Sequence, residues 1–593
     1  MNKLLTLLKP NALYLKGYAV PILFSLTLFV QVVLFQWFCY HNILITSLWK
    51  APAHFAVFWL SKIGIALFFA SFCLLTKRKW WTVAIVALVS LWCISNLIYY
   101  RANNLVLSVS AMLMADNLNG FQSSIRAYWN WQSTLLSVIP LVYALGLYFL
   151  KAPSRRTPMV FACLLGVVLV GDVAMRYIYR KIGEQSTFAS IVILPYQEFT
   201  KDTDNVSVVL IEDTRETNRY ISYHSIISNF PRIFAFHHAS QYNQRKASEL
   251  RMAGGLIPDE VEALLGERAD SGMPSHNLII VLVESLESWV LDVMDGNGVE
   301  IAPNLRMLSE KGLYLPYVRS QVREGVSGDG QLILNTGVLP LQQGAACMIF
   351  GDNRYRSLAD PFAASATIIP TQPNTWNQSA ASVAYGYQQT LDPGDEVQDE
   401  VVFRMAERWL DTVTLRPFCC QVITLSTHSP FDRVDGERAK FGTDMPQMLR
   451  NYLNCVRYAD SCIGRFVERL EARGLLENTT VVITGDHTIF KDNMLREYRK
   501  AAMQYNLDFK SGHNFVPAII LSPAVEKNTT VADTCGQYDI YPTLRALLGA
   551  ELYPWKGFGR NLLDPESQYP LSEQDAGKWS DVIIRSNWFA TKM

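Results

Sequence analysis

Residues 277–284 read NLIIVLVE, and residues 479–487 read TTVVITGDH. Each stretch contains a short, continuous apolar run rich in β-branched residues, which is typical of a strand buried on both faces of a sheet. Polar side chains follow the two runs directly: Glu284 after the first, and Asp486 and His487 after the second. Ligands of open parallel sheets bind beside the carboxyl ends of the strands, so these three side chains are predicted to line a functional site.

Strands and helices alternate around these two runs. Short apolar runs predict strands, and segments with helical periodicity or helix-end signals predict helices. The predicted strands are Asn277–Val283, Cys420–Leu425, Thr480–Thr484 and Phe515–Leu521, and the predicted helices are Pro303–Lys311 and Leu449–Arg473. This order predicts an α/β domain with a mostly parallel sheet sandwiched by helices. We expect it at residues 276–593, behind a linker and cap region at residues 181–275.

The N-terminal part of the chain is strongly apolar. Only 18% of the 593 residues are charged, and almost all of the long apolar runs precede residue 180. Five of these runs are long enough to cross a hydrocarbon core of roughly 30 Å. They are Tyr18–Cys39, His54–Leu75, Trp80–Tyr99, Trp131–Leu150 and Met159–Tyr179. We therefore predict a transmembrane domain of about five helices at residues 1–180.

Basic residues in the short loops predict the orientation of these helices. They lie before the first helix, between the second and third, and between the fourth and fifth, at Lys3, Lys9, Lys16, Lys77, Arg78, Lys79, Lys151, Arg155 and Arg156. The rule places these segments in the cytoplasm, so five crossings put the α/β domain outside. The formal net charge is zero, which gives no reason to expect a nucleic-acid partner.

The polar residues at the predicted strand ends suit a metal site. His428, in TLSTHSPF after the Cys420–Leu425 strand, joins Glu284, Asp486 and His487 there. Carboxylate and imidazole together suit zinc or manganese. The six cysteines outside the predicted membrane helices show no C-x-x-C spacing, so we do not expect a cysteine metal site, whereas disulfide pairing stays open.

Five sequence blocks resemble the alkaline-phosphatase/sulfatase superfamily, in order and at plausible spacing. They are NLIIVLVES (277–285), APNLRMLSEKG (302–312), YADSCIG (458–464), TTVVITGDH (479–487) and YDIYPTLRALLG (538–549). Five membrane helices before such a domain resemble the lipoteichoic acid synthase branch. The resemblance implies an alkaline-phosphatase-like fold. It also implies one divalent cation, Mn²⁺ or Zn²⁺, bound by Glu284, Ser327, Asp486 and His487.

Ser327 is the nucleophile that the resemblance implies. It sits in the turn-rich segment GVSGDG (325–330), whose backbone can approach a phosphate closely. A bound cation is one way to activate a hydroxyl. Where the branch usually has Lys-Thr-Ser-Asp, this chain has Val326-Ser327-Gly328-Asp329, so the nucleophile is Ser and the adjacent Lys is absent. Pro/Ala and Arg at the formylglycine positions of sulfatases are also absent, so no formylglycine is expected.

Other residues are expected to contact the substrate. His428 would bind phosphoryl oxygens or protonate the leaving group. Trp376 matches a Phe-Trp-Asn-Arg segment of the branch, although Gln378 replaces its arginine, so Arg354 and Arg356 are alternative sources of positive charge. His513, before Val516-Pro517, is a further candidate for the substrate or a second metal.

These features predict an enzyme of the bacterial cytoplasmic (inner) membrane with an extracytoplasmic catalytic domain. We expect it to transfer a phospholipid headgroup, phosphoglycerol or phosphoethanolamine, through phospho-Ser327 to a cell-envelope glycan or glycolipid. Two alternatives stay open. One is a membrane-anchored phosphodiesterase, phosphatase or sulfatase-like hydrolase that keeps the same site, and the other is a catalytically silent binding protein.

Overall fold

The computed structural model describes two compact units of the chain, one within residues 19–234 and one within residues 257–591. The residues described are 19–50, 59, 62–70, 78–103, 106–109, 112, 125–126, 128–150, 226–227, 230, 233–234, 257–267, 272–341, 344–435, 438–442, 444–490, 498, 501, 503–505, 507 and 515–591. Each unit is considered by itself.

Within its described residues, the first unit contains three helices that are long and apolar enough to cross a membrane. The spans are Ala19–Cys39 within α2 (Ala19–Lys50), Trp81–Ala102 within α4 (Trp81–Asn103), and Trp131–Tyr148, which is α7. They correspond to the first, third and fourth predicted crossings. The second predicted crossing is described only in part, as helix at residues 62–70, and the fifth lies outside the described residues. A membrane protein is thus confirmed, but the count of five crossings is not.

Polar contacts join the three helices of this unit. The Gln31 amide of α2 donates to the Ser90 hydroxyl of α4 at 2.7 Å, and that hydroxyl donates to the Leu136 carbonyl of α7 at 2.8 Å. Lys79 Nζ donates to the Leu147 carbonyl at 2.7 Å, at the C-terminal end of α7, where the helix macrodipole favours a positive charge. In hydrocarbon such bonds satisfy groups that no water reaches, so they fix how the helices pack.

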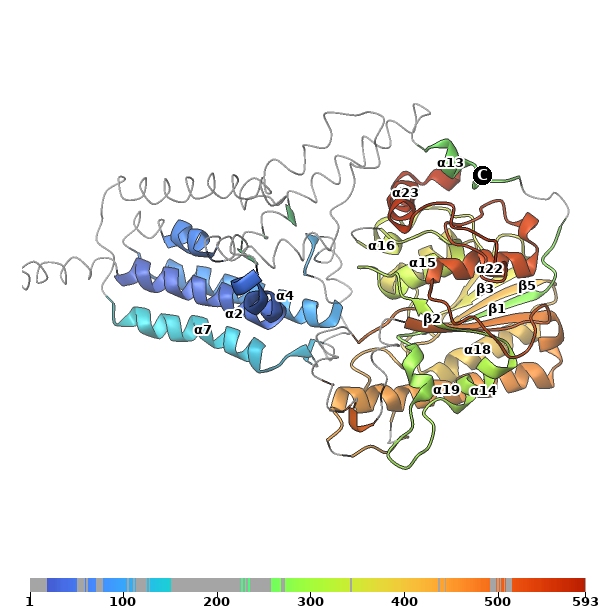
Figure 1. The fold of residues 1–593 in the computed structure, drawn as a ribbon, viewed down its shortest axis with the longest axis horizontal. Coiled ribbons are helices and arrows are strands. Elements are labelled where there is room, and N and C mark those ends of the chain that lie inside the picture. The colour runs from blue at the N-terminus through green and yellow to red at the C-terminus, as the bar shows by residue number, and fades with distance from the viewer. Residues whose placement is uncertain are drawn as a thin grey trace, which may run out of the picture. The chain divides into compact units, whose positions relative to one another are not determined.

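The second unit is built on one nine-stranded sheet (Figure 1). Its strands run in the order β4-β3-β5-β1-β6-β7-β2-β8, and β9 pairs with β2. They are β1 (Asn277–Val283), β2 (Leu313–Arg319), β3 (Ala364–Ile368), β4 (Gln389–Leu391), β5 (Phe418–Ile423), β6 (Thr479–Gly485), β7 (Phe515–Leu521), β8 (Thr529–Thr530) and β9 (Cys535–Gly536). From β4 to β6 every pairing is parallel, whereas β7 is antiparallel to both of its neighbours.

Helices cover both faces of this sheet, which confirms the predicted mostly parallel, helix-covered architecture. In Figure 1, α14, α18 and α19 lie on one face, and α15, α22 and α23 lie on the other. Their bounds are α14 (Pro303–Lys311), α15 (Ser327–Thr336), α18 (Asp399–Thr412), α19 (Gln447–Ala472), α22 (Ile540–Leu548) and α23 (Glu573–Ser586), with short α13 (Asp259–Glu262), α16 (Ala346–Ile349) and α17 (Gln378–Ala384). Both central strands, β1 and β6, are buried along their whole length.

The six cysteines of this unit are all buried and free of disulfides. They are Cys347, Cys419, Cys420, Cys455, Cys462 and Cys535. The pairing that the sequence left open is therefore absent from the described chain. Burial raises the pKa of the Cys455 thiol to about 12, which keeps it protonated and unreactive.

Candidate metal and nucleophile site

Strand register brings the first two polar segments together. β1 and β6 are adjacent and parallel, with Val283 opposite Gly485, so Glu284 and Asp486 leave the sheet side by side. A side chain at residue 485 could not fit, because its Cβ would lie 2.2 Å from the Leu286 carbonyl oxygen. The glycine before Asp486 thus permits the close approach of the two strand ends.

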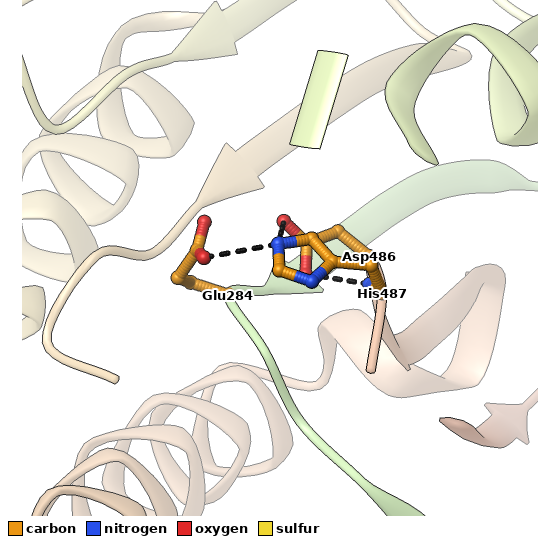
Figure 2. A group of neighbouring side chains, drawn as sticks. All are labelled: Glu284, Asp486 and His487. Atoms are coloured by element: carbon orange, nitrogen blue, oxygen red, sulfur yellow. Dashed lines mark hydrogen bonds and ion pairs between the residues drawn. The ribbon is translucent and has the colours of Figure 1, made fainter. Parts of the chain in front are cut away.

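Glu284, Asp486 and His487 form a buried cluster (Figure 2). These residues are about as buried as the sheet core, with exposed fractions of 4%, 2% and 3%. His487 Nε2 lies 3.2 Å from Glu284 Oε1 and 3.7 Å from Asp486 Oδ2, and one ligand atom from each residue lies within 4.8 Å of the others. Two carboxylates and an imidazole at this spacing fit a single divalent cation.

Ser327 meets the same cluster. Its hydroxyl donates to Glu284 Oε2 at 2.9 Å and lies 3.3 Å from His487 Nε2. The turn ends at Val326 and not at Gly330 as predicted, because Ser327 is the first residue of α15. The positive end of a helix macrodipole therefore adjoins the hydroxyl, which favours an anion there. Gly330 allows α15 to approach this closely, since a Cβ at that position would lie 2.6 Å from the Asp486 carbonyl oxygen.

Unusual backbone conformations occur at or near the predicted site residues. Of the seven described non-glycine residues with positive φ, five are predicted site residues or lie within three positions of one in the sequence: Ser285, Val326, Trp376, Asn377 and Phe431. Val326, with φ of 43°, is β-branched and directly precedes Ser327. Such conformations cost roughly 1–3 kcal/mol each and persist where surrounding contacts enforce them, commonly at active sites. Their concentration here therefore supports a functional site on independent grounds.

The ionisable groups of the cluster shift the pKa values of Glu284 and Asp486. Burial would raise the pKa of the Glu284 carboxyl, but the charge and hydrogen bond of His487, with a smaller contribution from His428, bring it well below its ordinary value. Burial, reinforced by the negative charge of Glu284, raises the pKa of Asp486. A cation bound between the two carboxylates would stabilise both in their ionised forms.

Neighbouring side chains that the sequence did not single out hold Glu284 in place. The Thr424 hydroxyl accepts from the Glu284 backbone N–H at 3.1 Å, and the Thr427 hydroxyl donates to the Glu284 carbonyl. On the other side, the Tyr452 hydroxyl donates to the Ser285 carbonyl at 2.8 Å. The loop after β5 and helix α19 therefore fix the backbone on both sides of this carboxylate.

Glu287 connects the two strand ends. It is fully buried, and its Oε1 accepts from the backbone N–H groups of Ile489 and Phe490 at 2.6 and 2.8 Å. Its Oε2 accepts from the Trp289 indole at 2.5 Å. The carboxylate thus ties the loop that follows β1 to the loop that carries His487. A second acidic residue three positions after Glu284 was the available sequence signal.

The remaining predicted residues occupy different surroundings. His428 Nδ1 lies 2.6 Å from the Ser429 carbonyl oxygen, and the imidazole interacts electrostatically with Glu284. Trp376 precedes Asn377, whose amide donates to the Cys347 carbonyl at 2.7 Å, and Cys347 packs against Gly328, the residue after Ser327. Arg354 is exposed and its guanidinium donates to the Asn353 carbonyl, while Arg356 is half-buried. His513 lies outside the described residues.

Two sequence families match the chain. The lipoteichoic acid synthase N-terminal domain matches residues 1–194, and the sulfatase family matches residues 356–550. The chain is 26% identical over 311 residues to lipoteichoic acid synthase 1 of Bacillus subtilis strain 168, covering 49% of this chain and 48% of the relative. It is 23% identical over 544 residues to lipoteichoic acid synthase 2 of the same strain, covering 86% and 78%. The chain thus spans about half the length of the first relative.

A solved structure has the same fold. The integral membrane protein lipooligosaccharide phosphoethanolamine transferase A from Neisseria meningitidis aligns with a TM-score of 0.52 and 15% identity, covering 90% of this chain and 96% of its own. These findings confirm the resemblance found in the sequence and the alkaline-phosphatase-like fold.

Proposed function

Because this chain is a lipoteichoic acid synthase-like member of the alkaline phosphatase/sulfatase superfamily, we propose that it transfers a phospholipid headgroup through a phospho-Ser327 intermediate. One observation carries the proposal: the Ser327 hydroxyl lies 2.9 Å from Glu284 and 3.3 Å from His487, inside a buried cluster suited to a cation. A hydroxyl aimed at such a cluster, at the start of a helix, is the arrangement that attack on phosphorus requires.

The residues divide the chemistry among them. Glu284, Asp486 and His487 would hold the cation, Mn²⁺ or Zn²⁺. Its positive charge would lower the pKa of the Ser327 hydroxyl and offset the negative charge of the phosphate. In the first step, Ser327 Oγ bonds to the donor phosphorus, and its proton leaves toward Glu284 Oε2, which accepts its hydrogen bond. The bond from phosphorus to the diacylglycerol oxygen breaks, and His428 protonates that oxygen.

The second step reverses the roles. An acceptor hydroxyl bonds to the same phosphorus while the bond from phosphorus to Ser327 Oγ breaks. His428 takes the acceptor proton, and Ser327 regains its own. The sum is one donor phospholipid plus one acceptor alcohol giving diacylglycerol plus the headgroup phosphodiester of the acceptor.

The membrane helices support a lipid donor and an envelope acceptor. The described part of the chain contains three helices suited to crossing a membrane. The catalytic unit is therefore covalently attached to a membrane-embedded part. We propose phosphatidylglycerol or phosphatidylethanolamine as the donor and a cell-envelope glycan or glycolipid as the acceptor, on the outer face of the bacterial cytoplasmic membrane. Domain boundaries at residues 180 and 275 belong to the same proposal.

The test is diacylglycerol release by the full-length protein in vesicles of each phospholipid with Mn²⁺. Ser327→Ala should abolish release. Ser461→Ala is the matched control, because that hydroxyl donates only within α19, to the Arg457 carbonyl at 2.9 Å, and it should leave release unchanged. Release that needs an added glycolipid supports transfer, whereas equal release without one identifies a phosphodiesterase. No release from either phospholipid contradicts the lipid-donor proposal.

A further inference from the structure

A second basic group belongs to the loop that carries His428. After β5 the chain passes through His428 and a tight turn to Arg433, which forms an ion pair with Glu396. The Gln398 amide donates to the Arg433 carbonyl at 2.7 Å. Both partners precede α18, at the same carboxyl edge of the sheet as Glu284. Arg433 is therefore anchored through its backbone and its side chain, with only 18% of the side chain exposed.

Aromatic packing fixes this turn against the candidate site. The Phe431 ring, two residues before Arg433, packs on Tyr452 at 5.1 Å and on Phe490 at 6.3 Å between ring centroids. Tyr452 is bonded to the backbone beside Glu284, and Phe490 is bonded to Glu287. The turn thus rests on the two segments that supply the cation-binding residues.

The Arg433 guanidinium has a buried donor without a hydrogen-bond acceptor among the described residues. Burial lowers the pKa of the Arg433 guanidinium, and the negative charge of Glu284 acts in the opposite direction. Glu396 binds one edge of the group, but the buried Nε–H has no hydrogen-bond acceptor among the described residues. A guanidinium offers five donors in a planar fork, and a buried donor without an acceptor is costly. An anion that reaches the guanidinium would supply that acceptor.

The chain also lacks the positive charges expected of the family it resembles. Val326 stands where the branch has a lysine, and Gln378 stands where it has an arginine. Neither side chain can offset the charge of a phosphodiester.

We propose that Arg433 binds the phosphoryl oxygens of the group transferred by Ser327 and supplies the positive charge that Val326 and Gln378 do not. This assignment rests on the proposed function, since the phosphoryl group is that of the donor. If Arg433 binds phosphoryl oxygens, it should also bind inorganic phosphate, at the position that the phosphoryl group of the donor would occupy.

The test compares Arg433→Met and Arg433→Lys with Arg469→Met in the full-length protein. Arg469 also pairs with an acid, Glu407 at 2.6 Å, but on the exposed surface of α19. Arg433→Met should weaken binding of inorganic phosphate to the Mn²⁺-loaded protein about 10- to 100-fold by calorimetry, as expected for loss of charge-assisted hydrogen bonds. Arg433→Lys should recover part of the loss, and Arg469→Met should match wild type. Mn²⁺ affinity should not fall in any of the three, because none of these residues is a cation ligand.

The outcomes separate this assignment from the proposed function. If wild type releases no diacylglycerol but Arg433→Met still weakens phosphate binding, the lipid-donor proposal fails and the Arg433 assignment stands. If Arg433→Met binds phosphate as tightly as wild type, or wild type binds none, the assignment is overturned. A fall in Mn²⁺ affinity equal to the fall in phosphate affinity would also overturn it, because it would place Arg433 in support of the cation residues.

Discussion

Replacing Glu287 tests whether the two strand ends depend on one buried carboxylate. Glu287→Ala removes the acceptor of three hydrogen bonds, from Ile489, Phe490 and Trp289, and leaves these buried N–H groups unpaired. Glu287→Gln keeps an oxygen that can accept the two backbone N–H groups and loses only the bond from the indole, because an amide N–H₂ then faces the Trp289 N–H.

The magnitudes follow from those counts. An unpaired buried donor costs about 1–3 kcal/mol, so Glu287→Ala should lower the free energy of unfolding by about 3–9 kcal/mol and Glu287→Gln by about 1–3 kcal/mol. The larger value is a substantial share of the ~5–15 kcal/mol that stabilises a typical domain. His487 precedes the two bonded residues closely, so Glu287→Ala should also weaken Mn²⁺ binding more than Glu287→Gln does.

Urea denaturation of the full-length protein in detergent, followed by tryptophan fluorescence, measures the first effect, and calorimetric Mn²⁺ titration measures the second. The expected order is wild type, Glu287→Gln, Glu287→Ala for both quantities. The free energy of unfolding of Glu287→Ala could lie within about 1 kcal/mol of the wild-type value, and the variant could bind Mn²⁺ equally well. In that case Glu287 does not hold the strand ends together and the account of its role is wrong.

Three further outcomes are expected. Mn²⁺ at 100 times its Kd should raise the free energy of unfolding of wild type by about 2.7 kcal/mol, measured by thermal unfolding, and EDTA should remove this stabilisation. The stability of His487→Ala and of Asp486→Asn should change with neither Mn²⁺ nor EDTA. Burial raises the pKa of Asp399 above its unfolded value, so its contribution to stability is present below the unfolded pKa and is lost as pH rises through the folded pKa. Asp399→Asn, whose amide oxygen can still accept from Leu425 and Ser426, should therefore gain stability relative to wild type in urea denaturation as pH rises above the unfolded pKa of about 4, and a constant difference would contradict this. Because the six cysteines of the second unit are free, dithiothreitol should leave its unfolding midpoint unchanged, and a lowered midpoint would reveal a disulfide.

Local sequence signals located several elements of the second unit well. β1, β7 and α14 have the residues predicted for them, because a continuous apolar run marks a buried strand and proline and glycine mark the two helix ends. The direction of β7 was not predictable, since such a run is buried equally well in either orientation. β2 was missed because Pro316 interrupts it, at the irregularity between Leu315 and Val318.

The candidate site divides in the same way. Glu284, Asp486 and His487 directly follow predicted strands, so the strand-end rule was enough to group them. Ser327 was found through a family motif, since its contact with the cluster depends on where α15 lies. Glu287, Tyr452 and Arg433 act across segments distant in sequence, and their roles depend on tertiary contacts that no local pattern encodes.

The central claim is that Ser327 becomes phosphorylated by a lipid headgroup, and intact-mass analysis tests it most directly. Full-length wild type and Ser327→Ala are incubated with phosphatidylglycerol or phosphatidylethanolamine and Mn²⁺, then quenched in acid. The account predicts a headgroup-phosphate adduct on wild type alone, and its mass would name the donor. An adduct of equal yield on Ser327→Ala, or no adduct on wild type with Mn²⁺ bound, would contradict it.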